Sequence, residues 1–156
     1  MALDTNCWHE AGHAVAAEVL SPGSVVSVVS QHGAGQVESV GDLVSADRVV
    51  QKLAGLMAET IAGGLDFERV ERVERTRRRY RRGTDLHCID HDLGGLRPDS
   101  IDRCREILTA HWSAVEAIAG SLHDAGRLDS VDVFEIVHLG ASEAQRGAQN
   151  PQKEVA

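Results

Sequence analysis

Two histidines four positions apart, with a glutamate directly after the first, constrain the fold of this chain more than any other feature. They are His9, Glu10 and His13, which fit the pattern HExxH. Residues i and i+4 lie on one face of an α-helix, so both imidazoles can reach the same metal ion. Glu10 points to one side, where it can reach a metal-bound water without being a ligand. Because HExxH is the signature of zinc hydrolases, we predict a helical zinc site with Glu10 as its general base.

The residues around the motif favour the helix that the motif needs. Asp4 or Thr5 suits the N-cap position, and Ser21-Pro22-Gly23 suits the end of a helix. Between these ends apolar residues recur with a helical period at Trp8, Ala11, Val15, Val19 and Leu20. We therefore expect the motif in the first half of an N-terminal helix.

The remaining pattern predicts a mostly helical α+β fold with a small sheet. Residues 24–40 alternate around a glycine-rich centre, which indicates a β-hairpin whose edge strand can align an extended substrate. Helical periodicity then covers residues 46–62 and, as one long helix, residues 99–125. Residues 126–129 are typical of a turn, and a short helix through Val137 follows.

The domain should end where the periodicity ends. From Gly140 onward the chain is polar and aperiodic, which favours disorder. A chain of 156 residues suits one domain with a real core. We therefore expect a single domain over residues 1–139 and a disordered tail over residues 140–156.

The composition favours a cytoplasmic protein without a membrane segment. The net charge of −8 gives no overall attraction to nucleic acid. No apolar run approaches the length of a membrane span, and the N-terminus lacks the basic and apolar regions of a signal peptide. Cys7, Cys88 and Cys104 are odd in number and widely spaced, which is typical of reduced thiols rather than of a disulfide framework.

A catalytic zinc site needs a third protein ligand, and spacing alone leaves several candidates. The extended motif with a third histidine is absent, because Val19 stands at its position. A second metal site at His87 and His91, which are also four apart, is a further alternative. The candidates for the third ligand are Glu59, Asp85, His87, Asp90, His91 and Asp92.

Four stretches of the chain resemble, in order, the peptidase domain of the FtsH family, the membrane-bound AAA zinc proteases. Residues 9–14 read HEAGHA, as in the family. Residues 53–61, LAGLMAETI, are similar to the family's LAGRAAEEI helix, and Gly83-Thr84-Asp85-Leu86 resembles its Asn-Asp-Leu segment. Residues 107–136 resemble the C-terminal helices of the family.

This resemblance implies a zincin-like domain that hydrolyses peptide bonds in peptides or unfolded proteins. It implies zinc as the cofactor, with His9, His13 and Asp85 as ligands and water in the fourth position. Glu59 stays open as the alternative third ligand, or as a carboxylate that hydrogen-bonds one of the histidines.

The chain also departs from the family. The ATPase domain and the membrane segments are missing, a charged stretch is inserted between Gly64 and Gly83, and the region after Asp85 is short. The resemblance therefore implies a metalloendopeptidase that works without ATP. The alternative is a zinc-binding interaction module, derived from such a peptidase, that cleaves nothing.

Half of the positive charge lies in one run, from Arg69 to Arg82. Eight of the sixteen basic residues fall there. The run is a candidate handle for an acidic partner or, against the overall charge, for nucleic acid. A solvated helix is the simpler interpretation, since Glu68, Glu71 and Glu74 each precede an arginine by four positions. A flap over the active site is a third interpretation.

Overall fold

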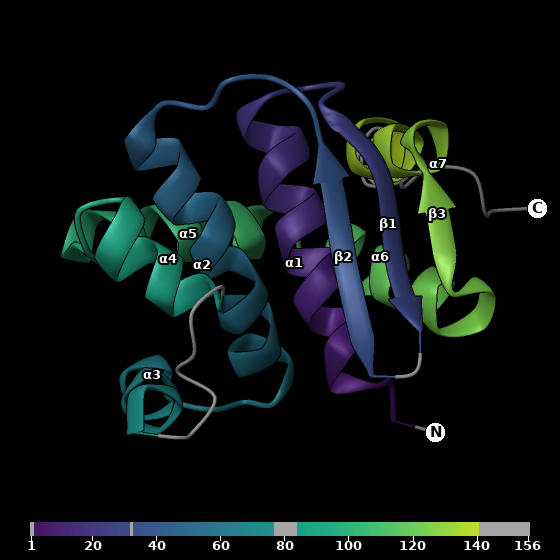
Figure 1. Cartoon of the computed structure of the whole chain (residues 1–156). Helices are drawn as coiled ribbons and strands as arrows, with labels where there is room; N and C mark the ends of the chain where they lie inside the picture. The colour runs from purple at the N-terminus through teal and green to yellow at the C-terminus, as the bar shows by residue number, and fades with distance from the viewer. Residues whose placement is uncertain (1, 32, 77–83, 141–156) are drawn as a thin grey trace, which may run out of the picture.

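The computed structural model describes residues 2–31, 33–76 and 84–140, which form a mostly helical fold with one small antiparallel sheet (Figure 1). The predicted α+β class is thereby confirmed. The elements are α1 (Thr5–Leu20), β1 (Val25–Gln31), β2 (Ala34–Ser39), α2 (Ser45–Ala62), α3 (Phe67–Thr76), α4 (Asp85–Asp92), α5 (Pro98–Ala110), α6 (Trp112–Ala125), β3 (Arg127–Asp129), α7 (Ser130–Phe134) and the π-helical turn η1 (Glu135–Leu139).

Helix α1 begins and ends where the sequence predicts. The Asp4 side chain caps it by accepting a hydrogen bond from the Asn6 amide at 3.0 Å, and Ser21 follows its last residue. Every residue from Glu10 to Glu18 is buried. A helix that is buried on all sides lies inside the core rather than on its surface. Glu10 to His13 of the motif therefore lie in the core, and His9 is half-buried at its edge.

The predicted hairpin is present, and the sheet has the order β2-β1-β3. Val28 in the central strand pairs with Val37 on one side and with Leu128 on the other. The predicted turn over residues 126–129 is wrong, because Arg127–Asp129 form β3. Three residues carry too little pattern to indicate a strand, and their partner is distant in the sequence. Strand β2 is left as an edge.

Helix α2 packs against α1 at a very short separation. A Cβ built on Gly12 would lie 2.6 Å from the Ala58 Cβ and closer still to the Ala54 carbonyl oxygen. Only glycine fits at such a contact. The two helices therefore approach closely just where the motif residues lie.

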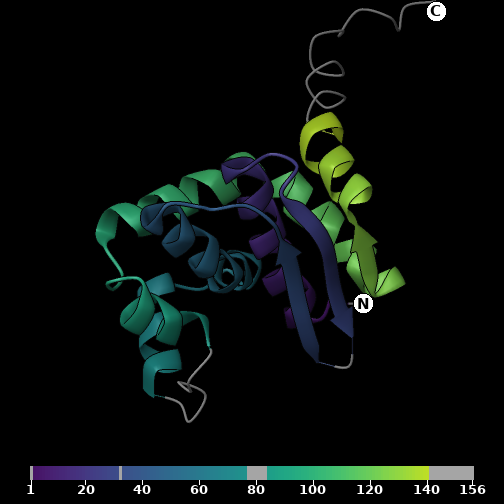
Figure 2. The ribbon, with the colours of Figure 1, turned by 45° about the horizontal axis from the view of Figure 1, so that its top comes forward.

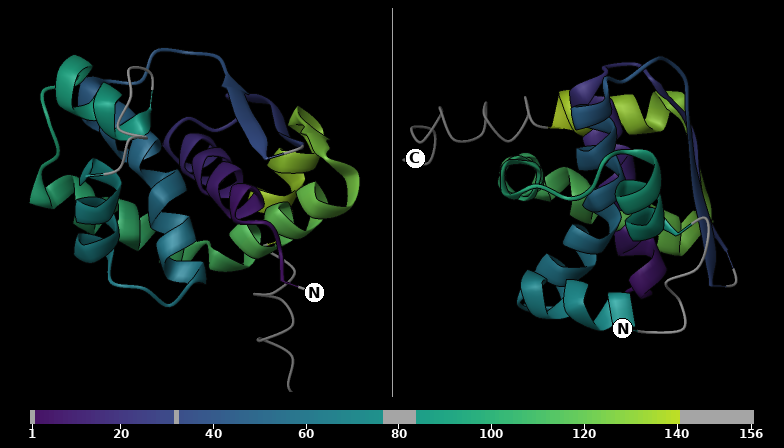
Figure 3. Two further views of the ribbon diagram at one scale, coloured as in Figure 1. Left: turned by 60° about the horizontal axis from the view of Figure 1, so that its bottom comes forward. Right: turned by 60° about the vertical axis from the view of Figure 1, so that its left-hand side comes forward.

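The single helix predicted over residues 99–125 is divided into α5 and α6. His111 separates them, with φ −115° and ψ 26°, outside the helical region. The apolar residues of α5 and α6 follow one helical period across His111, so the sequence pattern does not reveal that the helix is interrupted there. The bend lets α5 pack on α2 and α6 pack on α1. Both helices run along the side of α1 opposite the hairpin (Figure 3).

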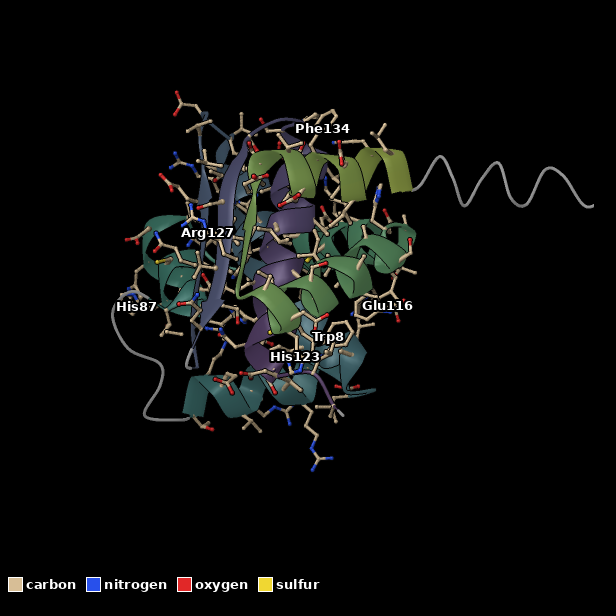
Figure 4. The ribbon with its side chains drawn as sticks, turned by 90° about the vertical axis from the view of Figure 1, so that its right-hand side faces the viewer. Trp8, His87, Glu116, His123, Arg127 and Phe134 are labelled. Carbon is tan, nitrogen blue, oxygen red and sulfur yellow. The ribbon has the colours of Figure 1, made fainter. Side chains whose placement is uncertain are left out.

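The outer elements complete the molecule. Helices α3 and α4 lie beyond α2, away from the sheet (Figure 2). Phe134 on α7 and Arg127 on β3 lie on the opposite side of the molecule (Figure 4). None of the helices in the described ranges is long and apolar enough to cross a bilayer. The expected tail, apart from Gly140, and Arg77–Arg82 of the arginine run lie outside the described residues.

Candidate metal centre

Three side chains from two distant elements meet at one point. His9 and His13 project from α1, and Asp85 is the first residue of α4. Asp85 Oδ2 lies 3.1 Å from His9 Nε2 and 3.0 Å from His13 Nε2, and the two Nε2 atoms are 3.0 Å apart. Among the described residues, this is the only group of three or more potential ligands close enough to hold a metal ion.

The second nitrogen of each imidazole ring is already occupied. His13 Nδ1 lies 2.7 Å from the backbone carbonyl oxygen of Gln51, which can only accept a hydrogen bond. His13 Nδ1 must therefore carry a proton. His9 Nδ1 lies 2.5 Å from Glu59 Oε1, another acceptor. In the neutral imidazoles both Nε2 atoms then offer lone pairs to the same point, as in metal sites whose histidines are oriented by a carboxylate or a carbonyl.

The charges at this point attract a cation. Burial lowers the pKa of His9, but hydrogen bonds to Asp85 and Glu59 outweigh that effect and raise it to about 10. Burial would raise the pKa of Asp85, but the bonds to His13 and His9 hold it well below its ordinary range. Lys52 Nζ lies 3.3 Å from Asp85 Oδ1, so Oδ2 is the carboxylate oxygen that faces the imidazoles. The lone pairs of the two Nε2 atoms and the Asp85 carboxylate repel one another. A proton or a metal ion between them removes this repulsion.

Gly55 of α2 leaves the space in which the ligand atoms converge. A Cβ at this position would lie 2.6 Å from His13 Nε2 and 2.7 Å from His9 Nε2. Any larger residue would occupy the meeting point of the two imidazoles. Gly55 is therefore required because a side chain would collide with the imidazoles of the site, and not because the helix itself needs glycine.

Glu10 lies beside the three converging groups and against the edge strand. Its side chain is buried, and burial raises the pKa of its carboxyl group. A Cβ on Gly35 of β2 would lie 2.5 Å from the Glu10 Cδ. Gly35 therefore makes room for the carboxylate directly beneath the backbone of β2. The arrangement places a carboxyl group between the cluster of potential metal ligands and the strand.

A cleft of about 720 Å³ opens above these groups. Residues of α1, β2, α2 and the start of α4 line it, and Figure 1 shows α1 between β2 and α2. The cleft is large enough for several residues of an extended peptide. Its lining includes His9, His13, Glu10, Gly35, Lys52, Glu59 and Asp85.

The other sequence candidates lie elsewhere. Glu59 contacts His9 Nδ1 rather than the meeting point. Asp90 pairs with Arg75, which also binds Glu71 at 2.7 Å as the predicted helical pair. The rings of His87 and His91 stack on one another with centroids 4.2 Å apart, and His87 lies at the periphery of the molecule (Figure 4). The second metal site considered from the sequence is not formed in the described part of the chain.

Four residues of the site were missed by sequence reasoning. Gly35 and Gly55 act through the space that an absent side chain leaves, Gln51 acts through its carbonyl oxygen, and Lys52 acts through an ion pair. The glycine in residues 53–61 was a usable signal for Gly55, since glycine inside an apolar helix usually has a packing or functional reason. The local sequence held no comparable signal for the carbonyl of Gln51.

Comparison of the chain with protein-family models and with curated proteins found no match. What this site can do therefore has to be inferred from its own residues.

Proposed function

We propose that this chain is a zinc-dependent metalloendopeptidase that, as an isolated chain, cleaves unfolded polypeptides without ATP. The observation that carries the proposal is the convergence of two Nε2 atoms and one carboxylate oxygen, with both Nδ1 atoms engaged elsewhere. Tetrahedral zinc with bonds of about 2.0–2.2 Å separates its ligand atoms by about 3.3 Å. The observed separations of 3.0–3.1 Å need only a small expansion to reach that value.

Zinc suits this set of donors. Two imidazoles and one carboxylate, with one position left open, form one of the protein ligand sets that occur at catalytic zinc sites. When bound, zinc supplies a Lewis acid and lowers the pKa of a bound water to about 7. His9, His13 and Asp85 would hold it, and Glu59 and the Gln51 carbonyl would fix the orientation of the two rings.

Glu10 is placed to move the proton. Its carboxyl is not one of the converging ligands, and its raised pKa makes it a better base than an exposed carboxylate. It would accept a proton from the attacking water and then donate that proton to the leaving amine. Both transfers occur at one carboxyl group, so the proton is returned within a single turnover.

Strand β2 offers a free edge along which an extended peptide can bind. The Val40 amide donates to the Ser24 carbonyl oxygen, so the even-numbered residues of β2 turn their backbone N–H and C=O groups toward β1. The alternation of an antiparallel ladder then turns Gly35, Val37 and Ser39 outward. A peptide added to this edge would pass directly over Glu10. The edge strand expected from the sequence is therefore part of the proposal.

A relationship to the FtsH-type peptidases is part of the same proposal, with a zincin-like fold. Two contacts support it: Asp85, which the resemblance implies as the third ligand, lies within 3.1 Å of both imidazoles, and the helix that resembles LAGRAAEEI contributes Gly55 and Glu59 to the cluster. A cytoplasmic location belongs to the same proposal and is supported by Cys7, Cys88 and Cys104, which are free thiols in the described residues.

Metal analysis with matched variants tests the proposal. Purified protein should carry one zinc, and His13→Ala should lose it, whereas His123→Ala, which changes an exposed histidine on α6, should not (Figure 4). Glu10→Gln should keep zinc and cleave casein about 10²–10⁴-fold more slowly, with the exposed Glu116→Gln as its control. Addition of ATP should leave the rate of casein cleavage unchanged. Zinc bound without any cleavage would favour the interaction-module alternative, and full zinc in His13→Ala would refute the site.

A further inference from the structure

A second cavity is lined by residues from the end of β2, the segment that follows it and the start of α2. Figure 1 shows this segment crossing from β2 to α2. The volume of the cavity is about 200 Å³. It is lined by Ser24, Ser39, Val40, Gly41, Leu43, Arg48 and Gln51. Arg48 is exposed on the first turns of α2, where a ligand from solvent can reach it. The cavity is therefore a small polar recess with one positive charge.

Its charge is opposite to that of the large cleft. The large cleft is lined by five carboxylates and one lysine, namely Asp4, Glu10, Glu59, Glu74, Asp85 and Lys52. None of the described residues that line the small cavity is acidic, and Arg48 and the Ser39 hydroxyl supply hydrogen-bond donors, whereas the Ser24 hydroxyl donates to the Ala17 carbonyl oxygen. A guanidinium binds carboxylates in a planar, two-bonded geometry. The chemistry of the recess thus favours a carboxylate.

The cavity is connected to the metal centre through Gln51. The Gln51 carbonyl oxygen accepts the hydrogen bond from His13 Nδ1, and its side-chain nitrogen donates to Ser39 Oγ at 3.4 Å. Gln51 lines both cavities. The outward-facing backbone of β2 runs between them, from Gly35 above Glu10 to Ser39 in the recess. One extended ligand can therefore occupy both.

The length of the strand sets the position of the carboxylate. Gly35 and Ser39 are four residues apart, which in a β-strand corresponds to about 14 Å. A peptide paired with β2 has the same spacing. A carboxylate in the recess would therefore belong to a residue about four positions from the peptide bond that lies over Glu10.

We propose that the Arg48 cavity is a subsite that recognises a substrate carboxylate about four residues from the scissile bond. The proposal rests on the proposed peptidase function and names its substrate class. The carboxylate comes from an aspartate or glutamate side chain or from the C-terminus of the substrate, and the two sources share the same chemistry.

Peptide binding tests the subsite independently of cleavage. Zinc-loaded Glu10→Gln protein is titrated with fluorescein-labelled ten-residue peptides of alanine, valine and glutamine, amidated at the C-terminus, in which one glutamate is moved along the sequence. Because Arg48 is exposed, we expect one position to gain about three- to tenfold in affinity over its glutamine counterpart. A second series carries a free C-terminal carboxylate at varied distance in place of the glutamate.

Charge variants identify the residue responsible. Arg48→Gln should remove the gain, Arg48→Lys should restore part of it, and Arg48→Glu should transfer the preference to a lysine-containing peptide. Arg103→Gln is the matched control, because Arg103 on α5 is exposed, pairs with Asp47 and does not line the cavity. A gain in only one of the two series identifies the source of the carboxylate.

The results separate this proposal from the proposed function. A positional gain that depends on Arg48, without cleavage by the wild type, would support the subsite and refute the peptidase. Cleavage by the wild type with no positional gain, or with a gain unchanged in Arg48→Gln, would refute the subsite alone. Equal affinity for all peptides in both series would also overturn it.

Discussion

Replacing Gly55 by alanine should abolish metal binding while leaving the fold intact. The added methyl group would lie 2.6 Å from His13 Nε2 and 2.7 Å from His9 Nε2, whereas ordinary contact begins at 3.4 Å. At least one imidazole must then move by about 0.8 Å, and metal–ligand distances tolerate only about 0.2 Å. The imidazoles are side chains that can rotate away, so the backbone need not shift.

The magnitude follows from which ligands are displaced. Loss of a group that merely orients a ligand weakens metal binding by about 10–100-fold. The new methyl group disturbs two ligands directly, so we expect a loss of more than 100-fold, or about 2.7 kcal/mol of binding free energy. Alanine is also the better helix former, by about 0.5–1 kcal/mol, so the metal-free variant should be no less stable than the metal-free wild type.

The assay combines chelator competition with thermal unfolding. Zinc should raise the Tm of the wild type by ligand linkage and leave the Tm of Gly55→Ala unchanged. Gly120→Ala is the matched control, since Gly120 lies within α6 and a Cβ there meets nothing within 4 Å. That variant should keep zinc and gain stability. Wild-type zinc affinity in Gly55→Ala would refute the reasoning, because the ligand atoms would then converge somewhere else.

Four further substitutions test other contacts. Asp85→Ala should lose zinc more completely than Glu59→Ala in the same chelator titration, and the reverse order would place Glu59 on the metal. Gly35→Ala should retain zinc but slow cleavage at least tenfold by displacing the Glu10 carboxylate, and unchanged cleavage would contradict that contact. Gly12→Ala should lower the free energy of unfolding by about 1–3 kcal/mol, measured by urea denaturation, because the α1–α2 contact has no room for a methyl group.

The elements that could be predicted from the sequence are those with a strong local signal. Apolar residues recur with a regular period within α1, within the hairpin and within α2. Each of these periods can be recognised from one segment of the sequence alone. The bounds of α2 differ from the expectation by one residue. The broken helix was not foreseen because His111 interrupts the backbone without interrupting the apolar spacing.

The site could be predicted only in part for a related reason. His9 and His13 carry their geometry in their spacing, whereas Asp85 is separated from His13 by 72 positions. The spacing of the residues left six candidates open, and it was a resemblance that favoured Asp85. Contacts made through a backbone carbonyl, as at Gln51, cannot be recognised from the residue type, because every residue has that group. Such partners become visible only when the helices are packed.

The sheet order has a consequence for the synthesis of the chain. Strand β1 receives its first neighbour, β2, at once, but Leu128 of its second neighbour follows Val28 by one hundred positions. Until then one edge of a valine-rich strand lacks its partner, and open edges of this kind pair with other chains. All three residues of the metal centre have been made by that time. A chain that stops before β3 would therefore contain all three proposed ligands and yet tend to self-associate, because β3 pairs with the open edge of β1 and supplies no residue to the lining of the cleft.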